Sequence, residues 1–303
     1  MHPPHPPLSF SMQLLQTWLR WSQRNAMYRS PAQLHAMLRK PPSPAAPPRS
    51  DAQLHVQALL APAGWQCWEL APQHPPAAPS ACWLYLHGGA YVRPITHWHW
   101  RMLRTLVLGS GCRVRVAQYP LAPASPCERT VVQLQQACTQ WMPAETPWGL
   151  MGDSAGAGMA VALTLAQRDT QQQMAQQLLL ITPWLDVALN DAATLALAPL
   201  DVMLAPDGAR EAGRLYAGSL PTSHPWVSPV HADLQGLPPI QLWCAEHDIC
   251  TPAALRFAER ARQCGTPVNI HHGPCMLHAW PLLPVAEARL AQQQLIAQMQ
   301  QAF

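Results

Sequence analysis

The sequence predicts an α/β protein whose central sheet is mostly parallel and covered by helices on both faces. Short apolar runs of strand length alternate with helical patterns through most of the 303 residues, which is typical of parallel strands joined by helical crossovers. Hydrophobic residues make up 49% of the chain and charged residues only 12%, so a large core can form. The length fits one α/β domain that carries a modest insertion or cap.

The first 50 residues are predicted to form a helical cap segment and a proline-rich linker. Between Leu8 and Tyr28, apolar residues recur at the spacing of one amphipathic helix. We expect this stripe to pack on the rest of the protein rather than on a membrane surface, because its polar face holds few cations. The stretch KPPSPAAPPRS, from Lys40 to Ser50, is too rich in proline for a helix or a central strand.

The main domain is predicted to run from residue 51 to residue 303. Strands are expected at Cys82–Leu86, Arg113–Ala117, Trp148–Met151, Leu178–Ile181, Ile240–Cys244 and Val268–Ile270. Helices are expected around Trp98–Leu108, Val131–Trp141, Ala155–Ala166, Pro252–Gln263 and Val285–Met299. The stretch Asn190–Leu220 shows no obvious strand, so residues 187–220 are expected to contribute to the cap.

A serine motif lies between an apolar strand and an apolar helix. The letters GDSAG, Gly152–Gly156, fit Gly-x-Ser-x-Gly. Its glycines allow a strained strand-to-helix turn that exposes Ser154 Oγ at the carboxyl edge of the sheet. The helix that follows directs free N–H groups and the positive end of its dipole to the same point. Together, motif and context predict a nucleophilic serine.

A glycine pair follows the Cys82–Leu86 strand in HGGAY, His87–Tyr91. Adjacent glycines let the backbone turn its N–H groups toward a developing oxyanion. The amides of Gly88, Gly89 and Ala155 are therefore predicted to form an oxyanion hole.

An ordered set of segments resembles the bacterial hormone-sensitive-lipase-like esterases, a family within the α/β-hydrolase fold. The segments, from about Cys82 to Trp280, are LYLHGGAY, YPLAP, GDSAGAG, TPWLDV, HPWVSPVHADLQGLPP, CAEHDIC and MLHAW. Ala90 stands where the family usually has glycine. The resemblance implies the α/β-hydrolase fold with a helical cap, and hydrolysis of short- to medium-chain acyl esters.

The resemblance also implies Ser154, Asp248 and His278 as a catalytic triad. Asp248 and His278 each follow a predicted strand, and the order Ser, Asp, His is that of α/β-hydrolases. Because the carboxyl ends of parallel strands meet at one edge, the three side chains are expected to converge there. The rivals weighed against them are the acids Asp186 and Glu246 and the histidines His271 and His272.

Charge and cysteine usage exclude several other classes of protein. The net charge is +3 and Lys40 is the only lysine, so no basic patch predicts nucleic-acid binding. Nine scattered cysteines without Cys-x-x-Cys spacing predict no zinc site, no cofactor and a reducing, cytoplasmic location. No apolar run is long enough for membrane insertion. A small-molecule ester is the predicted partner, and a homodimer is compatible with the sequence.

The machinery also leaves other functions open. The same triad could cleave amides or carbamates, or transfer acyl groups to an alcohol. A non-catalytic ligand-binding relative is disfavoured because all three candidate residues are present. Tryptophans that could contact an apolar acyl or alcohol group are Trp98, Trp100, Trp184, Trp226 and Trp280.

Overall fold

The sheet has eight strands, and all but its first two neighbour pairs are parallel. The computed structural model describes residues 7–23, 25–62, 65–74, 81–142 and 147–302. The strands lie in the order β1-β2-β4-β3-β5-β6-β7-β8. Their bounds are β1 Leu54–Leu59, β2 Gln66–Pro72, β3 Cys82–Leu86, β4 Arg113–Gln118, β5 Trp148–Asp153, β6 Gln177–Ile181, β7 Ile240–His247 and β8 Val268–Leu277. The predicted mostly parallel α/β sheet is therefore confirmed.

The two strands at the start of the sheet were not predicted. β1 pairs antiparallel with β2, which pairs antiparallel with β4. Most β1 side chains are only half-buried or exposed, because this strand lies at the edge of the sheet. It therefore lacks the continuous apolar run by which the central strands were recognised.

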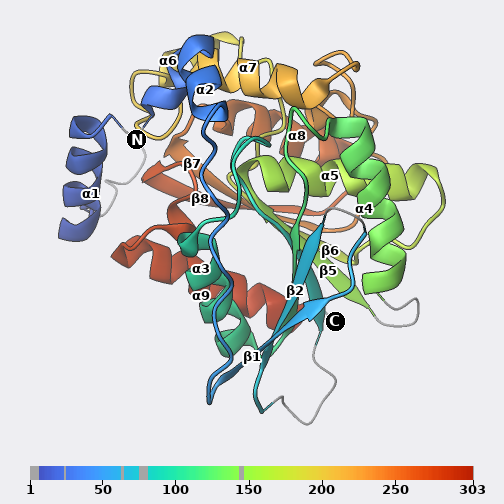
Figure 1. Ribbon diagram of the computed structural model, residues 1–303. Coiled ribbons are helices and arrows are strands. Elements are labelled where there is room, and N and C mark those ends of the chain that lie inside the picture. The colour runs from blue at the N-terminus through green and yellow to red at the C-terminus, as the bar shows by residue number, and fades with distance from the viewer. Residues whose placement is uncertain (1–6, 24, 63–64, 75–80, 143–146, 303) are drawn as a thin grey trace.

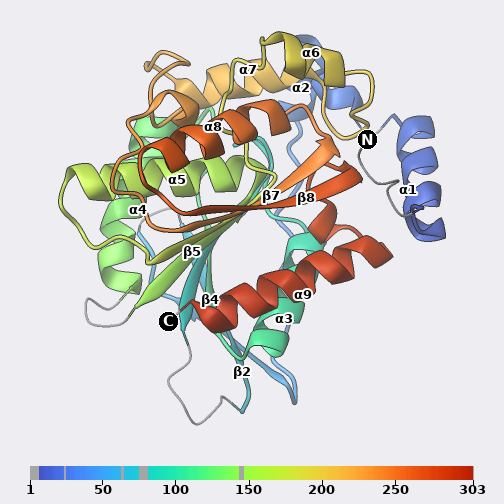
Figure 2. The same cartoon turned by 180° about the vertical axis from the view of Figure 1, so that it is seen from behind.

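Helices cover both faces of the sheet (Figures 1 and 2). On one face lie α3 His97–Ser110 and α9 Ala286–Gln301, and on the other α4 Cys127–Trp141, α5 Ser154–Asp169 and α8 Thr251–Gln263. Two clusters of buried apolar side chains fill the space between the sheet and these two helical layers. No described helix is long and apolar enough to cross a membrane.

The N-terminal helix is shorter than predicted. The expected helix from Leu8 to Tyr28 is wrong as a single element, because α1 Phe10–Trp21 ends and a 3₁₀ turn, η1 Ala26–Tyr28, follows separately. Gln23 has a φ of 49°, which a continuing helix cannot accommodate. A further helix, α2 Pro31–Leu38, begins at a proline after the Ser30 cap.

A helical layer lies over the carboxyl edge of the sheet. It consists of η1 and α2 together with α6 Ala192–Leu197 and α7 Pro206–Ala217, at the top of Figure 1. Helix α7 contacts both η1 and α2. Segments about 180 residues apart in sequence thus form one structure, as shown by the bond from Asn25 Nδ2 to the Asp201 carbonyl oxygen, 3.3 Å long.

Candidate active site

Ser154 lies on the turn between β5 and α5. Its φ of 51° is in the left-handed region, which is strained for a residue with a side chain. Gly156 lets α5 approach the end of the neighbouring strand β3 closely, because a Cβ there would lie 2.1 Å from the Leu86 carbonyl oxygen. The two backbones are therefore in direct contact, and the turn holds Ser154 at the carboxyl edge of the sheet.

Three predicted side chains are joined by two hydrogen bonds. His278 Nδ1 lies 2.8 Å from Asp248 Oδ2, and His278 Nε2 lies 2.7 Å from Ser154 Oγ. Because a carboxylate only accepts, Nδ1 carries the proton and Nε2 accepts from the serine hydroxyl. Asp248 follows β7 and His278 follows β8, so the sheet itself brings the three residues together.

The environment of His278 favours its protonated form. Burial lowers the pKa of His278, but the charge and hydrogen bond of Asp248, with the charges of Asp201 and Asp153, outweigh burial and raise it. Asp248 is completely buried, and its Oδ1 accepts from the Cys250 amide at 2.8 Å. This arrangement would stabilise an imidazolium formed when His278 takes a proton.

The loop after β3 lies beside Ser154, but its glycines have different partners. The Gly88 amide donates to Asp153 Oδ1 at 2.8 Å, so the predicted role of Gly88 as an oxyanion donor conflicts with its observed bond. Gly89 has a φ of 130°, which excludes other residues in practice. Within the described residues, the amides of Gly89 and Ala90 have no hydrogen-bond acceptor. Ala155, in the first turn of α5, has no intrahelical acceptor for its amide.

Asp153 connects the serine turn to this loop. Its Oδ1 also accepts from the Tyr85 hydroxyl, and its Oδ2 lies 3.5 Å from His99 Nε2. Burial raises the pKa of Asp153, but His99 and the hydrogen bonds from Tyr85 and Gly88 lower it overall. The GDSAG motif contained this residue, yet sequence reasoning assigned it no role.

The rival residues make other contacts. Asp186 Oδ1 accepts from the Ala188 amide at 3.0 Å, and Glu246 Oε2 accepts from the Cys275 amide at 2.7 Å. His271 stacks on Trp243 with ring centroids 4.3 Å apart, and His272 is exposed. None of these side chains is bonded to Ser154 in the described structure.

A further buried carboxylate, Asp201, lies behind the acid and was missed by sequence reasoning. Its Oδ2 accepts from the Ile249 amide at 3.0 Å, next to the amide that binds Asp248. Its Oδ1 accepts from the Met203 and Leu204 amides at 2.8 and 2.9 Å. Burial and the neighbouring Asp248 charge raise the pKa of Asp201 to about 7. No sequence signal marked this residue, because it lies in the irregular segment between α6 and α7.

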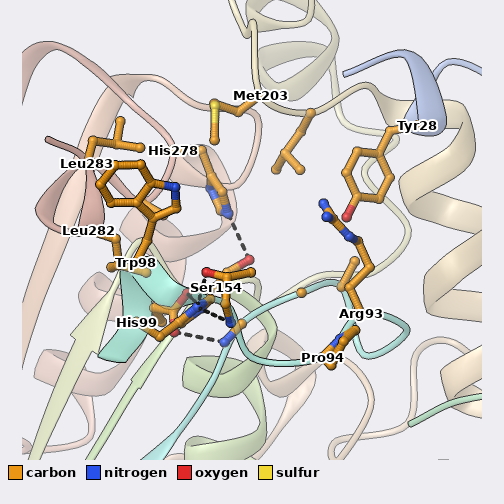
Figure 3. A pocket seen from close by; sticks show the side chains of 17 residues that line it. Tyr28, Arg93, Pro94, Trp98, His99, Ser154, Met203, His278, Leu282 and Leu283 are labelled. Carbon is orange, nitrogen blue, oxygen red and sulfur yellow. Dashed lines mark hydrogen bonds and ion pairs between the residues drawn. The ribbon is translucent and has the colours of Figure 1, made fainter. Parts of the chain in front are cut away.

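Ser154 and His278 open into a pocket of about 150 Å³ (Figure 3). Trp98, Leu282 and Leu283 form one side of it, with Met203 above His278. Tyr28, Arg93 and Pro94 form the other side. The remaining lining residues are Gly88, Gly89, Ala90, Thr96, His99, Asp153, Leu204 and Ala279. Of the five tryptophans considered from the sequence, this pocket includes Trp98 alone.

Two groups of described residues have the spacing of metal ligands. One contains Glu246, His247 and Cys275, and the other contains Asp248, Cys250 and His278, with ligand atoms within 4.8 Å of one another. In both groups, hydrogen bonds already occupy carboxylate oxygens. All nine cysteines lie within the described residues and are free thiols.

The sheet and its serine turn are those of the α/β-hydrolase class of proteins. The chain belongs to the alpha/beta hydrolase fold family, whose model matches residues 83–282. The predicted resemblance to bacterial hormone-sensitive-lipase-like esterases is confirmed by a solved esterase of that family, with a TM-score of 0.80, 25% identity, and coverage of 98% of this chain and 99% of the other.

Relatives of this chain carry esterase and lipase names. An acetyl-hydrolase of Streptomyces hygroscopicus is 34% identical over 66% of this chain and 70% of its own. A triacylglycerol lipase of Mycobacterium tuberculosis is 26% identical over 73% of this chain, which matches 46% of that longer protein. The protein is therefore an enzyme of the esterase or lipase type.

Proposed function

We propose that the protein is a serine carboxylic-ester hydrolase that acts on short-chain acyl esters through an acyl-enzyme. The observation that supports it most strongly is the chain of hydrogen bonds from Ser154 through His278 to buried Asp248. A hydroxyl bonded to a neutral imidazole, whose other nitrogen is held by a carboxylate, is an activated nucleophile.

The reaction follows from the positions of these atoms. Ser154 Oγ attacks the ester carbonyl carbon while His278 Nε2 takes its proton, and the imidazolium then protonates the leaving alcohol oxygen. Water attacks the acyl-enzyme in the same way, with His278 again accepting and returning the proton. Since only neutral His278 can accept, we expect the rate to rise with pH through a pKa above the ordinary value of 6.5.

The oxyanion donors we propose differ partly from those predicted. The amides of Gly89 and Ala90 have no acceptor in the described structure, and Ala155 starts the helix beside the nucleophile. We assign the oxyanion to the amides of Gly89, Ala90 and Ala155. Gly88 instead holds the loop in place through Asp153.

The pocket favours a short acyl chain. An apolar cavity of about 150 Å³ is comparable to one that holds a benzene molecule. The name of the acetyl-hydrolase relative also supports a small acyl group for this chain. We propose that the helical layer acts as the cap that closes this pocket, because Tyr28 ends η1 and because Met203 and Leu204 lie in the segment that joins α6 to α7.

The test compares p-nitrophenyl acetate, butyrate and octanoate with wild type, Ser154→Ala and Ser219→Ala. Ser219 is an exposed serine remote from the pocket, so its variant controls for handling and purity. We expect the two shorter esters to react fastest and Ser154→Ala to lower kcat by roughly 10⁴- to 10⁶-fold. A phosphonate should label wild type and Ser219→Ala but not Ser154→Ala. Wild-type turnover equal to that of Ser154→Ala would exclude the proposal.

A further inference from the structure

One cation lines the pocket that contains Ser154. Arg93 follows the oxyanion loop directly, and its amide donates to the Gly89 carbonyl oxygen at 2.9 Å. This bond fixes its backbone against the glycine that turns the loop. Its side chain extends into the pocket between Pro94 and Tyr28, on the side opposite His278 and Met203 (Figure 3).

The guanidinium of Arg93 has an unsatisfied donor within the part of the chain that the structure describes. Its Nε is buried and has no hydrogen-bond acceptor. Within the described ranges, carboxylates pair with the arginines at positions 104, 115, 168, 210, 214 and 256, but none pairs with Arg93. Asp153, the carboxylate that lines the same pocket, is bonded to Tyr85 and Gly88 and faces His99.

The unsatisfied donor of Arg93 lies in a mostly apolar pocket, where it costs free energy. The pocket walls are largely apolar or aromatic: Tyr28 and Pro94 lie on the same side as Arg93, and Trp98, Met203 and Leu282 lie across from it. A buried donor on a cation costs free energy unless an acceptor satisfies it. Guanidinium groups match carboxylates in shape, forming two parallel hydrogen bonds that a water molecule cannot reproduce.

We propose that Arg93 binds a carboxylate on the substrate, so that the preferred substrates are small esters carrying a second, free carboxylate. This inference rests on the proposed esterase function and names the substrate class for the same pocket. Arg93 is a specificity-determining residue and takes no part in proton transfer. Its effect should therefore depend on the charge of the ester and leave neutral esters almost unchanged.

The test pairs substrates of similar length with and without the charge. On the acyl side, the mono-p-nitrophenyl ester of succinate is compared with p-nitrophenyl butyrate. On the alcohol side, butyryloxyacetate is compared with propyl butyrate by titrating the released acid. The enzymes are wild type, Arg93→Gln, Arg93→Lys and Arg129→Gln, the last removing an equal charge from an exposed arginine on α4.

We expect Arg93→Gln to lower kcat/KM by roughly 10- to 100-fold for at least one of the two charged esters. For the neutral esters, kcat/KM should change less than about threefold. Arg93→Lys should retain part of the preference, and Arg129→Gln all of it. The side that shows the loss identifies where the carboxylate lies. Equal losses for charged and neutral esters, or no loss for any, would overturn the proposal.

A binding measurement separates this proposal from the esterase proposal. Succinate should raise the Tm of Ser154→Ala but not of the double variant Ser154→Ala, Arg93→Gln. If wild type hydrolyses none of the esters but succinate still raises the Tm of Ser154→Ala alone, the esterase proposal is wrong and the carboxylate site is supported. Equal responses to succinate in the two variants, with wild type active, would remove the carboxylate site alone.

Discussion

The carboxyl edge of the sheet and the helical layer above it contribute to the same pocket but are built differently. Ser154, Asp248 and His278 each follow a parallel strand directly, so their positions are set by strand register. Tyr28, Met203 and Leu204 reach the pocket from separate segments joined by polar contacts such as those of Asn25 and Asp201. The strands of the sheet thus position the three proposed catalytic residues, whereas contacts between segments distant in sequence position the pocket residues of the proposed cap.

The largest expected effect tests the acid at the sheet edge. Asp248→Asn should lower kcat by about 10⁴-fold, because an amide no longer fixes the reactive tautomer of His278 or stabilises its charge. Asp186→Asn and Glu246→Gln, whose side chains bond elsewhere, should stay within a few-fold of wild type. Steady-state kinetics on p-nitrophenyl butyrate measure all three. An inactive Asp186→Asn beside an active Asp248→Asn would move the acid to Asp186.

An intermediate effect tests the link between the two regions. Asp201→Asn should lower kcat/KM about tenfold, because an amide cannot accept from Met203, Leu204 and Ile249 together, and the loop bearing Asp248 loosens. Asp207→Asn, in the same layer but exposed and paired with Arg210, should behave as wild type. Loss of the negative charge should also move the acid limb of the pH profile to lower pH, since the Asp201 charge raises the pKa of His278.

The Asp201→Asn substitution should also change how the free energy of unfolding depends on pH. The folded-state pKa of Asp201, about 7, lies above the model-peptide value of 3.8. Its contribution to stability is therefore fully present below pH 3.8 and lost as pH rises through 7. The free energy of unfolding of wild type should fall relative to that of Asp201→Asn across this range, by an amount on the order of 2–4 kcal/mol. Urea denaturation at several pH values measures it, and parallel curves would contradict the assignment.

The smallest effect concerns the pocket wall. Met203→Ala should enlarge the pocket and raise the ratio of kcat/KM for octanoate to that for acetate by about tenfold, with little change in kcat on acetate. Leu195→Ala, on an exposed position of α6, is the matched control. An unchanged ratio would mean that the acyl chain lies along another wall, such as that of Trp98.

The same contrast explains which features could be predicted from the sequence. The central strands and the serine turn have local signatures, namely continuous apolar runs and glycines, so the sheet and the convergence of Ser154, Asp248 and His278 were predictable. The bond of the Gly88 amide could not be predicted, because the direction of that amide depends on Asp153, 65 residues away. Asp201 and Arg93 could not be recognised, because their roles depend on burial and on partners distant in sequence.

Three features expected from the sequence stay predictions. These are the division into residues 1–50 and 51–303, the homodimer and the cytoplasmic location. The free cysteines are compatible with a reducing compartment.

Gly156 fixes the distance between the start of α5, which carries Ser154, and the loop that follows β3. A Cβ at this position would lie 2.1 Å from the Leu86 carbonyl oxygen, so the two backbones meet with no side chain between them. No change of side-chain rotamer can therefore alter the distance between α5 and the end of β3. Substitutions confined to the helical layer should therefore change the pocket without moving Ser154 relative to the loop that follows β3.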